Sequence, residues 1–185
     1  MALRRGFKTW ANKVATETRQ ELGLGPYACL DPRQLAAYLG IPIIAMSDLR
    51  NIAPRVEHLM LVEPDVFSAA TVFSGVRRII VHNDSHAPTR QNSNLSHELS
   101  HGLLGHPPTP ALDDVGCRIW NQDVEDEATW LGAALLVPES AALAIARRGW
   151  TRAEAARRFG VSPQMIQYRL NVTGAEQRIR KTRAN

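Results

Sequence analysis

The sequence predicts an α+β fold, in which a small antiparallel sheet packs on a helical core and a helical hairpin follows at the C-terminus. Three observations lead to this prediction. Strand-like apolar stretches occur only between residues 42 and 82, and the apolar residues outside them recur at helical spacing. Near the C-terminus, two short amphipathic segments are joined by a turn that contains Gly160. With 185 residues, of which 44% are hydrophobic, the chain has room for one sizeable domain with a small appendage.

The elements follow from local signals along the chain. The apolar spacing of residues 6–22 predicts an amphipathic helix. Asp31-Pro32 is typical of a helix start, and this second helix should end near Gly40. Strands are expected at residues 42–46, 58–62, 68–73 and 76–82, with a turn at Ser74-Gly75. Further helices are expected at residues 88–105, 117–136 and 138–149, with a proline-rich, acidic loop at residues 107–114 between the first two.

The C-terminal segment has the outline of a helix-turn-helix. Thr151 and Glu154 resemble a capping box, and Ser162-Pro163 is typical of the start of a second helix. Polar and basic groups on that second helix could contact DNA, namely Gln164, Gln167 and Arg169. The alternative is a packing hairpin that covers the core, which is the more common use of two short helices.

Charge divides the chain into two regions. Residues 147–185 hold ten Lys or Arg and two Glu, a net charge of +8, whereas the whole chain carries +4 and residues 1–146 therefore carry −4. We therefore expect a main domain over residues 1–146 and a basic hairpin with a tail over residues 147–185. A basic tail is typical of contact with nucleic acid, although a solvated helix with a frayed end has the same composition.

The most informative stretch is His97-Glu98-Leu99-Ser100-His101, an H-E-x-x-H pattern. On a helix, residues i and i+4 share one face, so the two imidazoles can bind one metal ion while Glu98 reaches its water. An ordinary helix with two surface histidines is the alternative. The apolar flanks favour the metal site, because they place the helix half in the core.

A catalytic zinc has three protein ligands, so the third must come from elsewhere in the chain. Cys29 and Cys117 stand alone, with no C-x-x-C spacing, which argues against a cysteine site. Glu125 and Glu127 open the next predicted helix and are the candidates. An acidic residue in a first turn often only complements the helix dipole, and the spacing does not choose between the two glutamates.

The stretch from Leu95 to His106, together with that from Glu125 to Pro138, resembles the ImmA/IrrE family of metallo-endopeptidases. That family carries H-E-x-x-H on one helix and E-x-x-A-N on the next, before an alanine-rich run that ends in L-L-x-P. The resemblance implies a zincin-like core and makes Glu125 the third ligand, with Glu127 the runner-up. Three departures concern the residues around the ligands: Thr129 for Asn, Ser100 for Gly or Ala, and Asn92-Ser93 for Arg-Phe.

The residues and the resemblance together predict a mechanism. His97, His101 and Glu125 would hold Zn²⁺, and Glu98 would act as the general base. Two histidines and a carboxylate also suit Fe(II), but the glutamate inside the motif favours zinc. The sequence does not distinguish which nearby residue supports the ligands or the oxyanion; the candidates are His82, His86, His106 and Arg90.

The resemblance also implies a partner, since members of the family act on helix-turn-helix repressors. The expected function is therefore a regulatory protease that cleaves a repressor protein. Two alternatives stay open: a non-catalytic regulator that binds a repressor or DNA on a zincin-like scaffold, and a zinc hydrolase acting on a non-peptide amide or ester. No apolar signal core follows the basic N-terminus and no disulfide framework is present, which together predict a cytoplasmic location.

Overall fold

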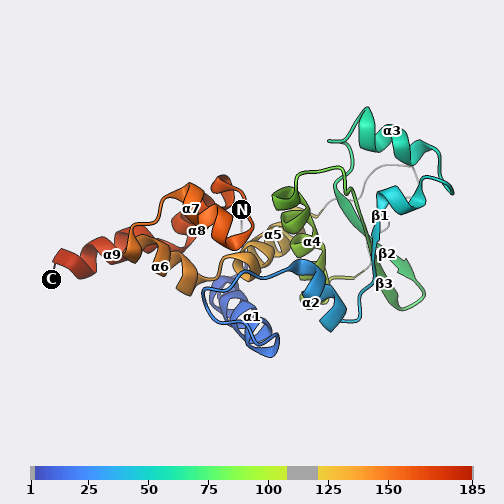
Figure 1. Cartoon of the computed structure of the whole chain (residues 1–185). Coiled ribbons are helices and arrows are strands. Elements are labelled where there is room, and N and C mark those ends of the chain that lie inside the picture. Colours follow the sequence, from blue (N-terminus) through green and yellow to red (C-terminus); the bar gives the residue numbers. More distant parts are fainter. Residues whose placement is uncertain (1–2, 108–120, 185) are drawn as a thin grey trace.

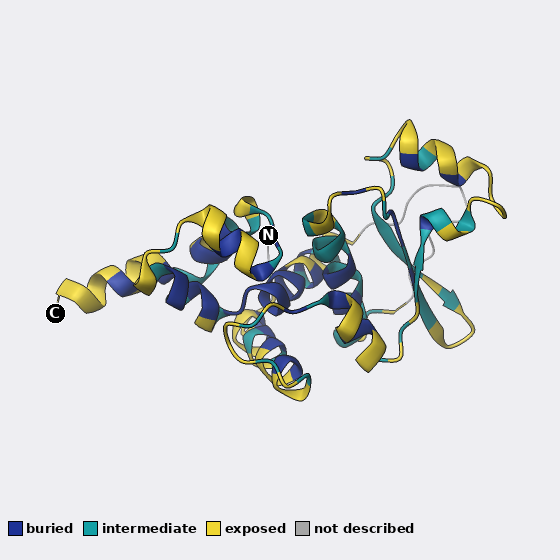
Figure 2. Cartoon of the chain, viewed as in Figure 1, coloured by how far each residue is buried: buried dark blue, intermediate teal, exposed yellow. Residues whose placement is uncertain are grey.

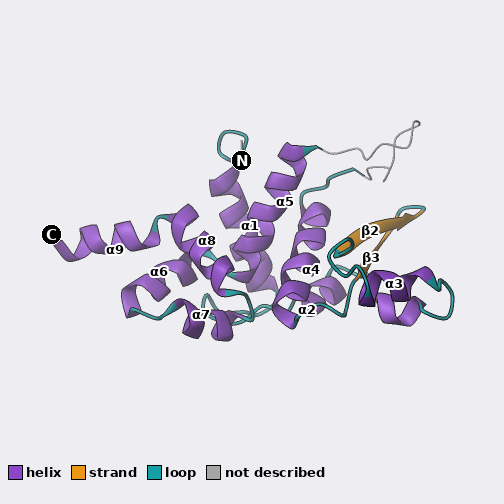
Figure 3. Ribbon diagram, turned by 90° about the horizontal axis from the view of Figure 1, so that it is seen from above, coloured by secondary structure: helices purple, strands orange, loops and turns teal. Residues whose placement is uncertain are grey.

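The computed structural model describes residues 3–107 and 121–184, and it confirms the predicted α+β class. Helix α5 (Gln122–Leu136) runs through the middle of the molecule, in contact with α1 (Phe7–Glu21) and α4 (Pro88–Leu103) (Figure 1). The sheet lies beyond α4 at one end, and the C-terminal helices lie at the other (Figure 3). This arrangement places α4 and α5 between the two ends.

The sheet has three strands in the order β1-β3-β2. Strands β2 (Ala69–Ser74) and β3 (Arg77–His82) form an antiparallel hairpin, whereas β1 (Ile43–Ala45) pairs with β3 in parallel. The prediction of an antiparallel sheet was therefore wrong for β1, and the sheet is mixed. More than twenty residues, including a 3₁₀ helix η1 (Met46–Leu49) and a helix, separate β1 from the hairpin, and a connection of that length permits parallel pairing.

The strand predicted at residues 58–62 was wrong, because residues 58–61 belong to helix α3 (Arg55–Leu61) and Val62 is its C-cap. Val56 and Met60, four positions apart, are both buried and share a small apolar cluster with Met46. The stretch thus follows the helical period and buries one face. In such a short apolar run, the helical period and the strand period are hard to tell apart from the sequence alone.

The first two helices agree with their predicted signals. Helix α1 ends before Gly23, which has a positive φ of 69°. Asp31 caps α2 (Pro32–Tyr38), because its Oδ1 accepts the backbone N–H of Arg33 at 2.9 Å. The side chain of Arg19 on α1 then donates to the carbonyl of Leu135 at 2.7 Å, which fixes α1 against the end of α5.

Helices α4 and α5 pack closely because Gly132 faces α4. A Cβ added to Gly132 would lie 3.1 Å from the carbonyl oxygen of Ser96 and 3.2 Å from the backbone nitrogen of His97. The hydroxyl of Ser96 donates to the carbonyl of Gly132 at 3.0 Å. The missing side chain at Gly132 therefore allows a close approach between the two helices that carry the candidate ligands. The described residues do not include residues 117–120, where α5 was expected to begin, or residues 108–114 of the predicted acidic loop.

The C-terminal helices follow their predicted caps. Thr151 and Glu154 form the expected capping box, and the Ser162 hydroxyl accepts the backbone N–H of Met165 at 3.1 Å. The bounds are Glu139–Arg148 for α6, Arg152–Phe159 for α7, Pro163–Thr173 for α8 and Ala175–Ala184 for α9.

Arg169 on α8 does not face solvent, so its predicted contact with DNA was wrong. It is fully buried, donates from Nε to the carbonyl of Val137 at 2.8 Å, and lies 4.8 Å from the ring centre of Trp130. Burial lowers its pKa to about 10. The reason is the helical period, since Ile166, Arg169 and Leu170 share the inward face of α8.

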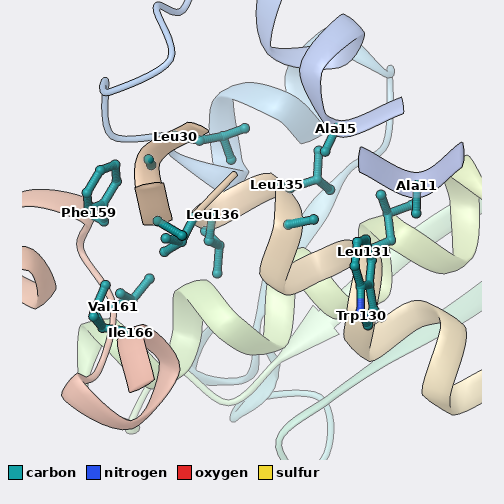
Figure 4. Packing of buried hydrophobic residues seen from close by; sticks show 14 of the residues in the cluster. Ala11, Ala15, Leu30, Trp130, Leu131, Leu135, Leu136, Phe159, Val161 and Ile166 are labelled. Carbon is teal, nitrogen blue, oxygen red and sulfur yellow. The ribbon is translucent and has the colours of Figure 1, made fainter. Parts of the chain in front are cut away.

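The buried residues form one main cluster around α5 (Figure 2). Ala11 and Ala15 of α1 pack near Leu131 and Leu135, while Phe159 and Ile166 of α7 and α8 lie near Leu136 (Figure 4). The core therefore continues across residue 146, and the division into two regions at that residue stays a prediction. In the described part of the chain, no single helix has the length and apolar character of a membrane span; only α5 and α6 together reach them, and the pair is bent by 54°.

Candidate metal centre

Three predicted ligands come together between α4 and α5. His97 and His101 lie one turn apart on α4, and Glu125 lies in the first turn of α5. His97 Nε2 is 3.0 Å from His101 Nε2 and 3.1 Å from Glu125 Oε2, and His101 Nε2 is 3.7 Å from the same oxygen. One ligand atom from each residue thus lies within 4.8 Å of the others.

This donor set fits a metal ion. Ligands about 2.0–2.1 Å from a tetrahedral zinc lie about 3.3 Å from one another, close to the three separations found here. Two neutral imidazoles that face each other through unprotonated Nε2 atoms cannot hydrogen-bond, whereas a cation between them would satisfy both lone pairs. The three side chains are 15–26% exposed, so the cluster is reachable from solvent.

The local structure keeps Glu125 charged and in place. Hydrogen bonds from His101 and His97, in the tautomers that carry a proton on Nε2, hold the pKa of Glu125 well below its ordinary value and keep the carboxylate ionised. Asn121 caps α5, because its side-chain oxygen accepts the backbone N–H groups of Asp123 and Val124. The capped turn directs Glu125 toward α4.

Glu98 directly follows the candidate ligand His97 in the chain, and its side chain is held by the sheet. The hydroxyl of Thr71 on β2 donates to Glu98 Oε2 at 2.6 Å. Sequence reasoning missed Thr71, although the alternation of exposed and half-buried residues along β2 places Thr71 on the inward side. A hydrogen bond to one carboxylate oxygen leaves the other oxygen of Glu98 available for proton transfer.

Two further contacts support the histidines from behind. Thr129 Oγ1 lies 3.4 Å from His97 Nδ1, so the departure from asparagine keeps an oxygen at this position. His106 Nδ1 lies 2.9 Å from His101 Nδ1. Burial, and then the neighbouring His101, lower the pKa of His106. Glu127 lies 3.6 Å from His106 Nε2 and is not part of the three-ligand cluster.

The sequence from residue 35 to residue 171 matches the family model described as Peptidase_M78, the IrrE N-terminal-like domain. The chain belongs to the Peptidase_M78 family. The matched stretch runs from within α2 to within α8 and includes both helices of the candidate metal centre. A comparison with curated proteins found no match. Membership of the Peptidase_M78 family confirms the predicted resemblance and supports a metallopeptidase type of function.

The other candidate residues of this Peptidase_M78 chain serve the fold. His86 Nε2 contacts the carbonyl of Pro64 at 2.8 Å, and Arg90 pairs with Asp65. His82 is buried at the end of β3, where burial lowers its pKa. His86 and Arg90 fasten the segment after α3 to the start of α4. Neither they nor His82 belong to the His97, His101 and Glu125 cluster among the described residues.

Proposed function

We propose that this protein is a zinc-dependent metallo-endopeptidase, in which His97, His101 and Glu125 hold the metal and Glu98 is the general base. The observation that carries the proposal is the position of Glu98. It directly follows a ligand of the three-residue cluster, and Thr71 holds it from the sheet at 2.6 Å. A cluster that only stabilised two helices would have no use for an oriented carboxylate on the residue that follows a ligand.

The chain's own residues perform the proton transfers. Zinc, when bound, polarises the scissile carbonyl and lowers the pKa of the attacking water. Glu98 takes a proton from that water and later gives it to the leaving nitrogen. Thr71 restricts the rotation of the Glu98 carboxylate during both transfers. His97 and His101 must be neutral to act as ligands.

Zinc is proposed over Fe(II) because the motif contains the glutamate that a hydrolytic metal site needs. Two histidines and a carboxylate are compatible with both metals. Iron oxygenase sites need no general base between the two histidines. Elemental analysis of protein purified without added metal tests this choice, and one equivalent of iron in place of zinc would contradict it.

The proposed substrate is a helix-turn-helix repressor, and the proposed role is regulatory. Membership of the Peptidase_M78 family supports a peptidase, and the resemblance to ImmA/IrrE proteins supports a repressor as its substrate. A protease with this role would act in the cytoplasm, where the repressor meets DNA.

Incubation with a helix-turn-helix repressor, chosen first from the genes next to this one, tests the function. We expect chelator-sensitive fragments by intact mass, and we expect Glu98→Gln to bind zinc as tightly as the parent but to cleave at least about 100-fold more slowly, because the general base contributes on the order of 10²–10⁴ to the rate. A Glu98→Gln variant that cleaves at the parental rate would refute the base assignment.

A second candidate function is a non-catalytic regulator that binds the repressor or DNA. The net charge of +8 in residues 147–185 favours it, because a basic surface attracts nucleic acid. The same variant separates the two functions. A binding regulator keeps its biological output in Glu98→Gln, and a protease loses it.

A further inference from the structure

His106 lies just beyond α4 and is folded back onto His101. Gly105, with a positive φ of 65°, reverses the chain there, and the backbone N–H of His106 donates to the carbonyl of His101 at 3.0 Å. The two rings meet through their Nδ1 atoms at 2.9 Å. His101 therefore presents Nε2 to the metal cluster and Nδ1 to His106.

We propose that His106 is a positioning residue for His101, and that Glu127 and Arg4 hold His106 in turn. This rests on the proposed metal site. The contacts continue from His106 Nε2 to Glu127 Oε2 at 3.6 Å, and from Glu127 Oε1 to Arg4 Nε at 3.0 Å. The family resemblance left Glu127 as the runner-up ligand, and the sequence left His106 among four candidates for supporting the ligands or the oxyanion.

The placement of protons allows one arrangement when a cation is bound. His101 Nε2 must then be unprotonated, so its proton is on Nδ1 and is donated to His106 Nδ1. His106 Nδ1 is therefore the acceptor, and the proton of His106 is on Nε2, toward the Glu127 carboxylate. Arg4 balances the charge of Glu127 from the other side. Glu127 thus selects the tautomer of His106, and His106 selects the tautomer of His101.

Burial makes this selection effective. The side chains of His106 and Glu127 are 11% and 13% exposed, against 26% for the ligand His97. An unsatisfied N–H costs more in such surroundings than in water. The wrong tautomer of His101, with its proton on Nε2, would bring two unprotonated Nδ1 atoms face to face, and neither could then be hydrogen-bonded.

The geometry argues against two other roles. His106 is not a ligand, because it contacts the nitrogen of His101 that faces away from the metal cluster. It is not an oxyanion donor, because one ring nitrogen is occupied by His101 and the other faces Glu127. Glu127 meets His106 and Arg4, and not His97 or Glu125.

Zinc affinity of the full chain tests the proposal without any substrate, by competition with a chromogenic chelator. We expect His106→Leu to weaken zinc binding about 10–100-fold, as loss of a partner behind a metal ligand generally does. His106→Asn should stay within about threefold of the parent, because its side-chain oxygen can take the place of the Nδ1 acceptor. His58→Leu, which changes an exposed histidine of α3 paired with Glu63, should leave the affinity unchanged.

A double substitution tests the order of the contacts. Glu127→Leu alone should weaken zinc binding about two- to tenfold, and should add nothing in the His106→Leu background, because Glu127 acts through His106. Parental affinity in His106→Leu overturns the proposal, and so does a further loss on adding Glu127→Leu. If His106→Leu fails to fold, Glu127→Leu decides alone, and unchanged affinity there overturns the proposal. A protein that binds zinc as expected but cleaves nothing would refute only the proposed function.

Discussion

Glu125 and Glu127 are two residues apart on one helix, yet the structure gives them different partners. Glu125 faces both histidines, while Glu127 faces His106 and Arg4. We expect Glu125→Gln to lose zinc almost completely, since two protein ligands remain, whereas Glu127→Gln keeps the three-ligand set and binds zinc within tenfold of the parent. Isothermal titration with zinc measures both. Equal losses in the two variants would show that the carboxylates share the metal.

Sequence spacing predicts which residues lie together only where they are near one another in the chain. His97, Glu98 and His101 follow from helical spacing, because one turn places them together. The choice between Glu125 and Glu127 depends on how α5 rotates against α4, which spacing does not contain. The contact from Thr71 to Glu98 joins a strand to a helix across 27 positions, and no local signal indicates it.

At the scale of elements, Gly132 decides how closely α4 and α5 approach. We expect Gly132→Ala to lower the free energy of unfolding by about 1–3 kcal/mol, because its Cβ would crowd the backbone of Ser96 and His97, even though alanine favours a helix by about 1 kcal/mol. Urea denaturation of the metal-free protein measures this change.

Gly102→Ala on α4 is the matched control for that substitution. Its added Cβ would meet only side chains, the nearest being Ile41 at 3.5 Å, so we expect an unchanged or slightly raised stability. If both glycine variants behave alike, the close approach at Gly132 is not what sets the spacing of the helices.

Helix starts with a clear capping signal were predicted correctly, whereas a short apolar run without one was misassigned. Asp31, Thr151 and Ser162 each accept a backbone N–H at a helix start, and the chain's local chemistry determines these ends. The run around Met60 has no comparable signal, so its helical period was mistaken for a strand. The pairing of β1 with β3 depends on a long connection, and no local pattern indicates it.

For the whole molecule, composition indicated the class and charge indicated a basic C-terminal region, but neither showed what that region packs against. Arg169 illustrates the difference. Its charge favoured a role at the surface, yet the structure buries it over Trp130 of α5. The C-terminal helices thus complete the core around α5, the helix that also carries Glu125. A change at the metal centre should therefore affect the stability of the entire fold.

Zinc should act as a cross-link between α4 and α5, the two helices at the middle of the molecule. At a free concentration about 1,000 times the dissociation constant, a ligand bound only by the folded state adds about 4 kcal/mol. For a chain of this size, that amount raises Tm by about 8–16 °C. Scanning calorimetry with zinc and with chelator measures the shift, and we expect one transition in both cases because α5 belongs to a core common to both ends. Glu125→Gln should show no shift with zinc. A parent protein whose Tm is the same with zinc and chelator would show that the metal does not link the two helices.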